Sequence, residues 1–87
     1  MGECEFRDKA INAVVAYFNN NRDISDSKPI TTDEVYIVWQ CKTLQNNKAM
    51  LSTSVSDGMY YEFTYNGDKN QAYLDAYKKI HNMCLQY

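Results

Sequence analysis

The sequence predicts a single α+β domain over residues 1–87, in which a three-stranded antiparallel meander carries two helices packed on one face, in the order α-β-β-β-α. Two observations lead to this fold class. Apolar side chains occupy every second position in three successive segments of residues 34–66, with short turn signals between them. The flanking segments have apolar residues at helical spacing instead. With 87 residues, the chain can bury one core but not two independent ones.

The N-terminal segment, about residues 3–18, has the spacing of an amphipathic helix. Ile11, Val14 and Phe18 lie three and four residues apart, which places them on one side of that helix. We expect this side to face the sheet.

Residues 19–33 are the most polar part of the chain. Pro29 keeps the residue before it out of helical geometry, which argues against a continuing helix. This segment is therefore predicted to be a surface linker, with Ile24 or Ile30 attached to the core.

The predicted sheet covers residues 34–66 and buries its odd-numbered positions. Residues opposite each other on neighbouring strands share a face, so aligning odd with odd positions requires loops of odd length. Three-residue loops at 45–47 and 56–58 meet this requirement, with Asn47 and Gly58 in the left-handed conformation. The resulting rows across the sheet are Trp39 with Thr53 and Tyr61, and Cys41 with Leu51 and Phe63.

The even-numbered face of the predicted sheet mixes aromatic, aliphatic and polar side chains. The register puts Tyr36 and Tyr60 together on this face. Aromatic and methionine side chains with a polar surround are typical of protein interaction surfaces. We therefore take as the candidate binding patch Tyr36, Val38, Gln40, Met50, Ser52, Tyr60 and Glu62.

A second helix is predicted at about residues 69–85. The chain turns at Asn66-Gly67, and Asp68 with Gln71 has the spacing of a capping box at a helix start. The expected buried stripe of this helix is Tyr73, Tyr77, Ile80 and Cys84.

Residues suited to catalysis or metal binding are few. His81 is the one histidine of the sequence, so a histidine-based catalytic or zinc centre has to use it, with Cys84 on the same helix and Cys41 on the sheet. No second pair of ligands has metal spacing, and the three glycines form no phosphate-binding loop. We interpret His81 as a helix-surface residue and the thiols as free, buried small hydrophobes. The sequence predicts a protein that is not an enzyme, with no catalytic residues, no metal and no cofactor.

The charge balance argues against a general attraction to nucleic acid. The chain has 9 basic and 11 acidic residues, which gives a net charge of −2, and this is a poor match for phosphate backbones. No apolar run has the length of a membrane span, and no secretory signal is present. We expect a cytosolic protein with no membrane partner.

Four segments resemble a family of small uncharacterised proteins encoded by bacteriophages and prophages of Gram-positive bacteria. They are Lys42–Ala49, Asp57–Glu62, Tyr65–Lys69 and Tyr73–Lys79, so the resemblance covers about the last half of the chain. It implies a small protein in the cytosol of a bacterial host. Binding of a host or phage component, including inhibition of a host defence system, is a common role in that setting.

Two functional hypotheses follow. The first is a non-enzymatic interaction protein that binds a host or phage protein, or a small ligand, through the even face, either as a monomer or as a homodimer. The alternative is a nucleic-acid-binding accessory factor in phage replication or recombination. In that case exposed tyrosines stack on bases, with Lys42, Lys48 and Lys69 near the backbone. Steep weakening by salt distinguishes the second from the first.

Overall fold

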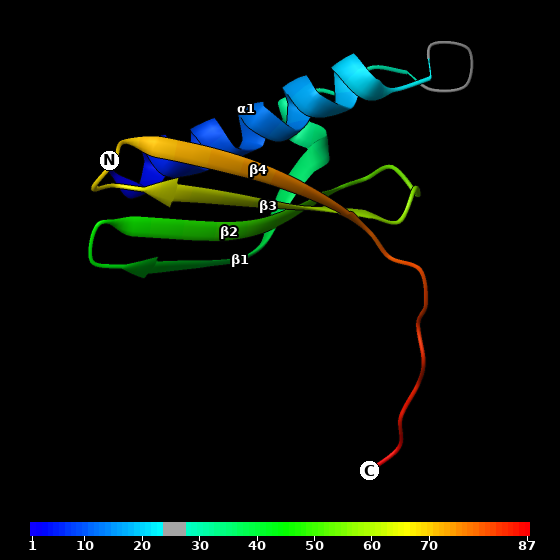
Figure 1. The fold of residues 1–87 in the computed structure, drawn as a ribbon. Helices are drawn as coiled ribbons and strands as arrows, with labels where there is room; N and C mark the ends of the chain where they lie inside the picture. The colour runs from blue at the N-terminus through cyan, green and yellow to red at the C-terminus, as the bar shows by residue number, and fades with distance from the viewer. Residues whose placement is uncertain (24–27) are drawn as a thin grey trace.

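The computed structural model, which describes residues 1–23 and 28–87, has one helix lying on one face of a four-stranded antiparallel sheet (Figure 1). The strands are neighbours in the order of the chain, β1-β2-β3-β4. The elements are α1 (Glu3–Asn21), a 3-10 turn η1 (Thr32–Glu34), β1 (Val35–Thr43), β2 (Asn46–Thr53), β3 (Met59–Asn66) and β4 (Gln71–Lys78). The α+β class is confirmed. The predicted α-β-β-β-α order, with three strands and two helices, is wrong.

The error lies in the last third of the chain, where the predicted helix at 69–85 is absent. Residues Gln71–Lys78 form β4, which pairs with β3 along its whole length, and residues 79–87 continue without helix or strand. The alternation of Tyr73, Asp75 and Tyr77 on one side of β4 has the period of a strand. The same tyrosines four residues apart also fit a helix, so periodicity alone did not separate the two.

Hairpin chemistry between β3 and β4 explains why the strand forms. The side-chain oxygen of Asn66 accepts hydrogen bonds from the backbone N–H groups of Asp68 and Lys69, at 3.1 and 3.3 Å. Asn70 adopts the left-handed conformation with φ of 50° and accepts a 2.8 Å hydrogen bond from the Tyr65 hydroxyl. These contacts stabilise a turn that sends the chain back along β3. The expected capping box therefore does not form, because Gln71 pairs with Asn66 in the ladder.

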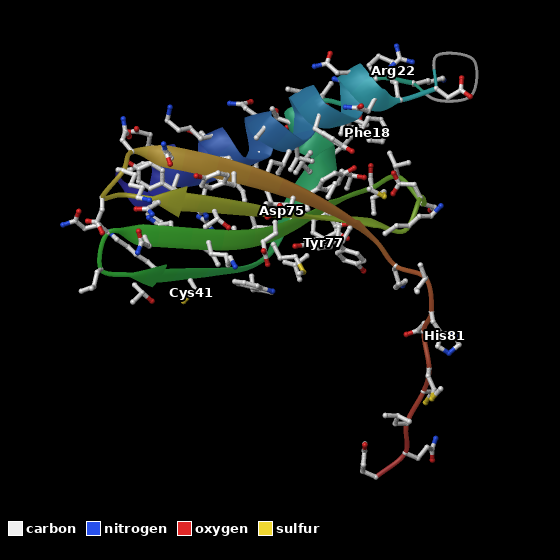
Figure 2. The ribbon with its side chains drawn as sticks, viewed as in Figure 1. Phe18, Arg22, Cys41, Asp75, Tyr77 and His81 are labelled. Carbon is white, nitrogen blue, oxygen red and sulfur yellow. The ribbon has the colours of Figure 1, made fainter. Side chains whose placement is uncertain are left out.

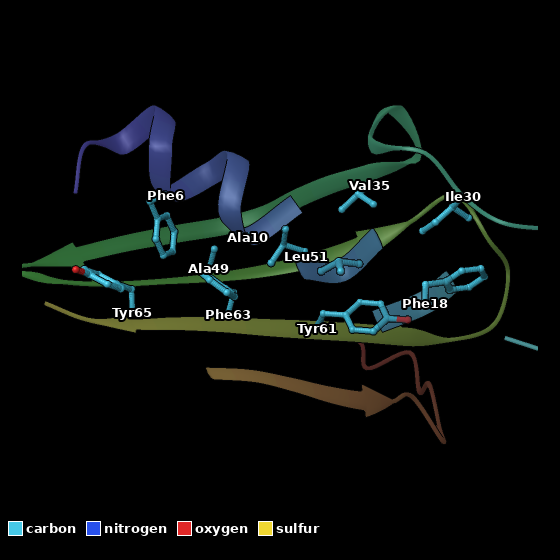
Figure 3. Packing of buried hydrophobic residues seen from close by; sticks show 11 residues of the cluster. Phe6, Ala10, Phe18, Ile30, Val35, Ala49, Leu51, Tyr61, Phe63 and Tyr65 are labelled. Atoms are coloured by element: carbon cyan, nitrogen blue, oxygen red, sulfur yellow. The ribbon is translucent and has the colours of Figure 1, made fainter. Parts of the chain in front are cut away.

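The core lies between α1 and the sheet (Figure 3). The buried side of α1 is a row of residues four apart, Phe6, Ala10, Val14 and Phe18. Val14 and Phe18 are thus confirmed as sheet-facing, whereas Ile11 is only half-buried. On the sheet side the buried hydrophobic residues are Val35, Ala49, Leu51, Tyr61, Phe63 and Tyr65.

The predicted register is wrong, and a β-bulge in β1 is the main reason. Ile37 pairs with Leu51, but the pairing then shifts so that Trp39 lies opposite Met50. A bulge moves every later side chain of its strand to the opposite face. Trp39 and Cys41 therefore lie on the face away from α1, although the alternation assigned them to the core. Across the sheet the observed rows are Ile37 with Leu51 and Tyr61, and Ala49 with Phe63.

The bulge compensates for a turn that is shorter than predicted. Thr43 pairs with Asn46, so only Leu44 and Gln45 connect β1 to β2, with Leu44 at a φ of 55°. A two-residue loop joins odd to even positions, and the extra residue in β1 restores odd-to-odd pairing. Asn47, which was expected in the loop, is a buried strand residue. The left-handed Gly58 is confirmed, with φ of 73°.

The segment before the sheet is attached to the core at Ile30, which is one of the two residues expected to do so. The Asn19 side chain donates to the Ile30 carbonyl at 3.0 Å and accepts from the Ile30 N–H at 2.8 Å. The predicted linker at 19–33 is shorter than expected, because α1 extends to Asn21 and η1 begins at Thr32. The other expected attachment, Ile24, lies outside the described residues.

Candidate functional site: the open face of the sheet

The face of the sheet away from α1 is the candidate site, and we call it the open face. Side chains alternate between the two faces of a strand, so the register assigns its members directly. Figure 2 shows Cys41 and Tyr77 on this side of the sheet. The open face comprises Tyr36, Trp39 and Cys41 of β1, Lys48, Met50 and Ser52 of β2, Tyr60, Glu62 and Thr64 of β3, and Tyr73, Asp75 and Tyr77 of β4.

Large aromatic side chains are exposed on this face. Tyr36 is 52 % exposed and Tyr77 is 51 % exposed, and Trp39 and Tyr73 are similarly accessible. Tyr77 lies opposite Tyr60 on β3, so the aromatics extend over neighbouring strands. Large exposed apolar patches on small proteins mark binding surfaces more often than isolated exposed residues do.

The part of this face over β1, β2 and β3 is hollowed. The hollow has a volume of about 400 Å³. Such a recess accepts an apolar side chain from a partner, which is how the strongest contacts of protein interfaces are built. Its lining consists of Trp39, Cys41, Thr43, Asn46, Asn47, Lys48 and Thr64.

The charged groups of the open face are largely compensated. Lys48 Nζ lies 3.3 Å from Glu62 Oε1, and the Glu62 position pairs with Asp75 on β4. The net charge of these three side chains is −1, counted as one lysine against two carboxylates. A face of this sign repels phosphate groups rather than attracting them.

The structure brings together five of the seven predicted patch residues, Tyr36, Met50, Ser52, Tyr60 and Glu62. Val38 lies in the bulge and is exposed. Gln40 lies opposite Ala49, on the side of α1, so its predicted face is wrong. Ser52 is buried, and its hydroxyl donates to the Met59 carbonyl at 3.1 Å.

Sequence reasoning missed Trp39, Tyr73 and Tyr77 as members of the site. No local signal marks the bulge that turns Trp39 outward. The period-two spacing of Tyr73 and Tyr77 was visible in the sequence and could have identified both if β4 had been recognised.

His81 and the thiols do not come together. His81 and Cys84 lie on the extended segment that leaves the body after β4, whereas Cys41 lies on the open face (Figure 2). Among the residues that the structure describes, no three histidine, cysteine, aspartate or glutamate side chains form a metal-binding group. All three cysteines are exposed, so the expectation that they are buried is wrong.

A second recess, of about 300 Å³, lies on the other side of the sheet, between the end of α1 and the β2–β3 loop. Its buried Tyr61 has a raised pKa, because burial and the neighbouring Asp57 carboxylate both disfavour the ionised phenol. Asp57 itself accepts a 3.0 Å hydrogen bond from the Met59 N–H. The walls are mainly apolar, so this recess offers a ligand few directed polar contacts.

Within the described part of the chain, no helix is long and apolar enough to cross a membrane.

A comparison with family profiles finds a match over residues 7–87 to a family described as a family of unknown function (DUF6275). The match includes most of α1, which lay outside the resemblance seen in the sequence. No curated protein and no solved structure matches the chain.

Proposed function

We propose that this chain, which belongs to the DUF6275 family of unknown function, works through the surface that its fold leaves uncovered. The protein is a non-enzymatic interaction module that binds a protein surface through the open face of its sheet. The single observation that carries this proposal is the exposure of four large aromatic side chains, Tyr36, Trp39, Tyr73 and Tyr77, on one face.

The composition of the open face supports a protein rather than a small ligand as the partner. Tyrosine, tryptophan and methionine are enriched in protein interfaces, and hot-spot residues pack into recesses such as the one beside Trp39. The face extends across four strands and is shallow. Small-molecule sites instead enclose most of the ligand surface in a deep cleft.

The biological setting that we propose rests on the resemblance to phage and prophage proteins. In that setting the protein acts in the cytosol of the infected bacterium, and its partner is a host or phage protein. Inhibition of a host defence component is one such role. The open face supplies the binding surface for it, and no catalytic step is required.

The nucleic-acid alternative receives less support from the positions of its lysines. Lys42 lies on the side of α1, opposite Asn47, while Lys48 lies on the open face and pairs with Glu62. Lys69 is in the β3–β4 loop. These three cations therefore do not follow one continuous surface, as a nucleic-acid backbone requires.

Photo-crosslinking in the natural host cell tests the proposal. The photoreactive residue p-benzoylphenylalanine replaces Tyr77, which is half exposed on the open face. The matched control carries it in place of Asn12, an exposed residue of α1. We expect a protein adduct, identified by mass spectrometry, from position 77 and none from position 12.

Two outcomes would overturn the proposal. One is the absence of any protein adduct at position 77 beyond the control, and the other is an adduct to nucleic acid instead. A purified partner then gives the second readout: its affinity should change little between 50 and 200 mM salt, whereas phosphate contacts would weaken it by orders of magnitude over that range.

A further inference from the structure

We infer that the protein bound by the open face is a second copy of this chain, and that residues 80–87 of each copy lie on the open face of the other. This inference rests on the proposed function, because it names the occupant of the same face. In the described part of the chain, the segment after β4 and the open face both carry large apolar side chains that the fold leaves uncovered.

The segment 80–87 leaves the body of the molecule instead of packing on it. Directly before the segment, the Lys79 N–H donates a 2.7 Å hydrogen bond to the Gly58 carbonyl. Beyond this bond the chain runs away from the sheet and from α1 (Figure 1). Every residue of the segment is exposed, and Ile80 retains 93 % of its accessible surface.

The composition of this segment suits a buried position. Met83, Leu85 and Tyr87 occupy alternate positions, which in an extended chain places them on one side. The segment contains no aspartate, glutamate, lysine or arginine. Large apolar side chains gain roughly 1.5–3 kcal/mol each when they leave water. In a monomer, the apolar side chains of both the segment and the open face stay in water and do not gain this free energy.

The size of the open face favours an interface that includes the segment. Strands of eight residues, with about 3.3 Å per residue and about 4.8 Å between strands, give a four-stranded face of roughly 500 Å². A stable interface buries about 800 Å² on each partner. Contact between two open faces alone falls short of this area. An extended segment roughly 26 Å long, laid on each face, supplies the remainder.

The charges of the two surfaces are complementary. The open face has a net charge of −1 from Lys48, Glu62 and Asp75. Two basic residues, Lys78 at the end of β4 and Lys79 after it, directly precede the segment. Reciprocal exchange brings these opposite charges together twice, through one contact repeated by two-fold symmetry.

Solution mass measured by light scattering over a range of protein concentration is the first test. The expected mass is twice 10.1 kDa. A variant with Met83→Ser and Leu85→Ser should dissociate to monomers, with a dimer at least about 100-fold weaker. The control, Asn82→Ser with Gln86→Ser, alters the intervening polar positions and should remain a dimer. Because the segment is exposed in the monomer, both variants should keep the circular dichroism spectrum of the folded chain.

Cross-linking between natural cysteines tests the position of the segment. The Cys4→Ser variant retains Cys41 on the open face and Cys84 in the segment. A mixture of ¹⁵N-labelled and unlabelled chains is treated with a short bismaleimide. We expect Cys41–Cys84 peptides that join a labelled chain to an unlabelled one. Cross-links found only within one chain would place the segment on its own sheet and overturn the inference.

The result distinguishes this inference from the proposed function. A wild-type monomer at all concentrations, together with an adduct to a different protein at position 77, overturns the second copy as occupant and leaves the open face as a binding surface. A dimer that persists in the Met83→Ser, Leu85→Ser variant overturns the role of the segment. A dimer with no adduct at position 77 contradicts both.

Discussion

The two faces of the β1–β4 sheet are built by the same strands but differ in burial. On the side of α1, Phe6 and Phe63 lie with ring centroids 5.6 Å apart, and Leu51 has no accessible surface. On the open face, Tyr36 and Tyr77 retain about half of theirs. Both faces are rich in large apolar side chains, so composition does not separate them. The difference is that only one of them has a helix to cover it.

Under the proposed function, folding depends on the covered side of the sheet and binding on the open side. Substitutions on the covered face remove packing that the native state requires, so they should lower the free energy of unfolding. Substitutions on the open face remove contacts that form only in a complex.

Replacing Phe6 by Ala should be the most destabilising change. The ring is fully buried between α1 and β3 and contacts Phe63, and truncation of such a residue costs about 3–5 kcal/mol. Urea unfolding of the variant measures this cost. A loss below about 1 kcal/mol would contradict the assignment of the core to this face. Tyr17→Ala on the same helix, at a partly exposed position, is the control and should cost less.

Asn19→Ala should lower stability by about 1–3 kcal/mol. The change removes the side chain that satisfies both backbone groups of Ile30, and unsatisfied buried backbone groups are costly. Faster hydrogen exchange at the Ile30 amide is the specific readout. Asn20→Ala, at the exposed neighbouring position, should leave that amide as protected as in the wild type.

The free energy of unfolding of the Tyr61→Phe variant should fall less than that of the wild type as the pH becomes alkaline. Burial, the Asp57 carboxylate and Tyr17 raise the pKa of Tyr61 in the folded state above the ordinary value of 10.0. As the pH rises, the unfolded chain therefore releases this proton before the folded chain does. The contribution of Tyr61 to the free energy of unfolding is complete below pH 10 and is lost as the pH rises through the folded pKa.

Denaturation midpoints measured from pH 8 to pH 11 would show this difference. The matched control is Tyr77→Phe, which removes a hydroxyl from the open face instead of from the core. Equal profiles for Tyr61→Phe and the wild type would contradict the proposed cause.

Tyr36→Ala combined with Tyr60→Ala should have the smallest effect on folding and the largest on binding. Tyr36 on β1 is half exposed, and Tyr60 on β3 is partly exposed on the same face, with β2 between the two strands. We expect a monomer destabilised by no more than about 1–2 kcal/mol, together with loss of the complex. Circular dichroism and light scattering on the same sample measure both. Complete unfolding would show that the open face belongs to the core.

The sequence predicted the covered face better than the open one. Alternation in 46–66 placed Leu51, Tyr61 and Phe63 in the core, because burial on one face imposes that pattern. Alternation also placed Tyr36, Met50, Ser52, Tyr60 and Glu62 together on the opposite face. These residues precede the bulge or lie on other strands, so the bulge does not affect their alternation.

The features that could not be predicted are the turns and the shift in strand pairing that accompanies one of them. The bulge compensates for the two-residue turn at Leu44, and neither has a distinctive local signal. β4 forms because the Asn66 and Asn70 side chains fold a turn that favours a hairpin. Helical periodicity in 69–85 was the competing signal, and pairing with β3 outweighed it.

The fluorescence of Trp39 tests whether the open face is covered in the complex. Trp39 is the one tryptophan of the chain and is 41 % exposed on this face. Acrylamide quenching is measured as the protein is concentrated or its cross-linked partner is added. We predict that quenching falls and the emission shifts to shorter wavelength on association, with circular dichroism unchanged. A complex in which Trp39 remains as accessible as in the free chain would contradict this account.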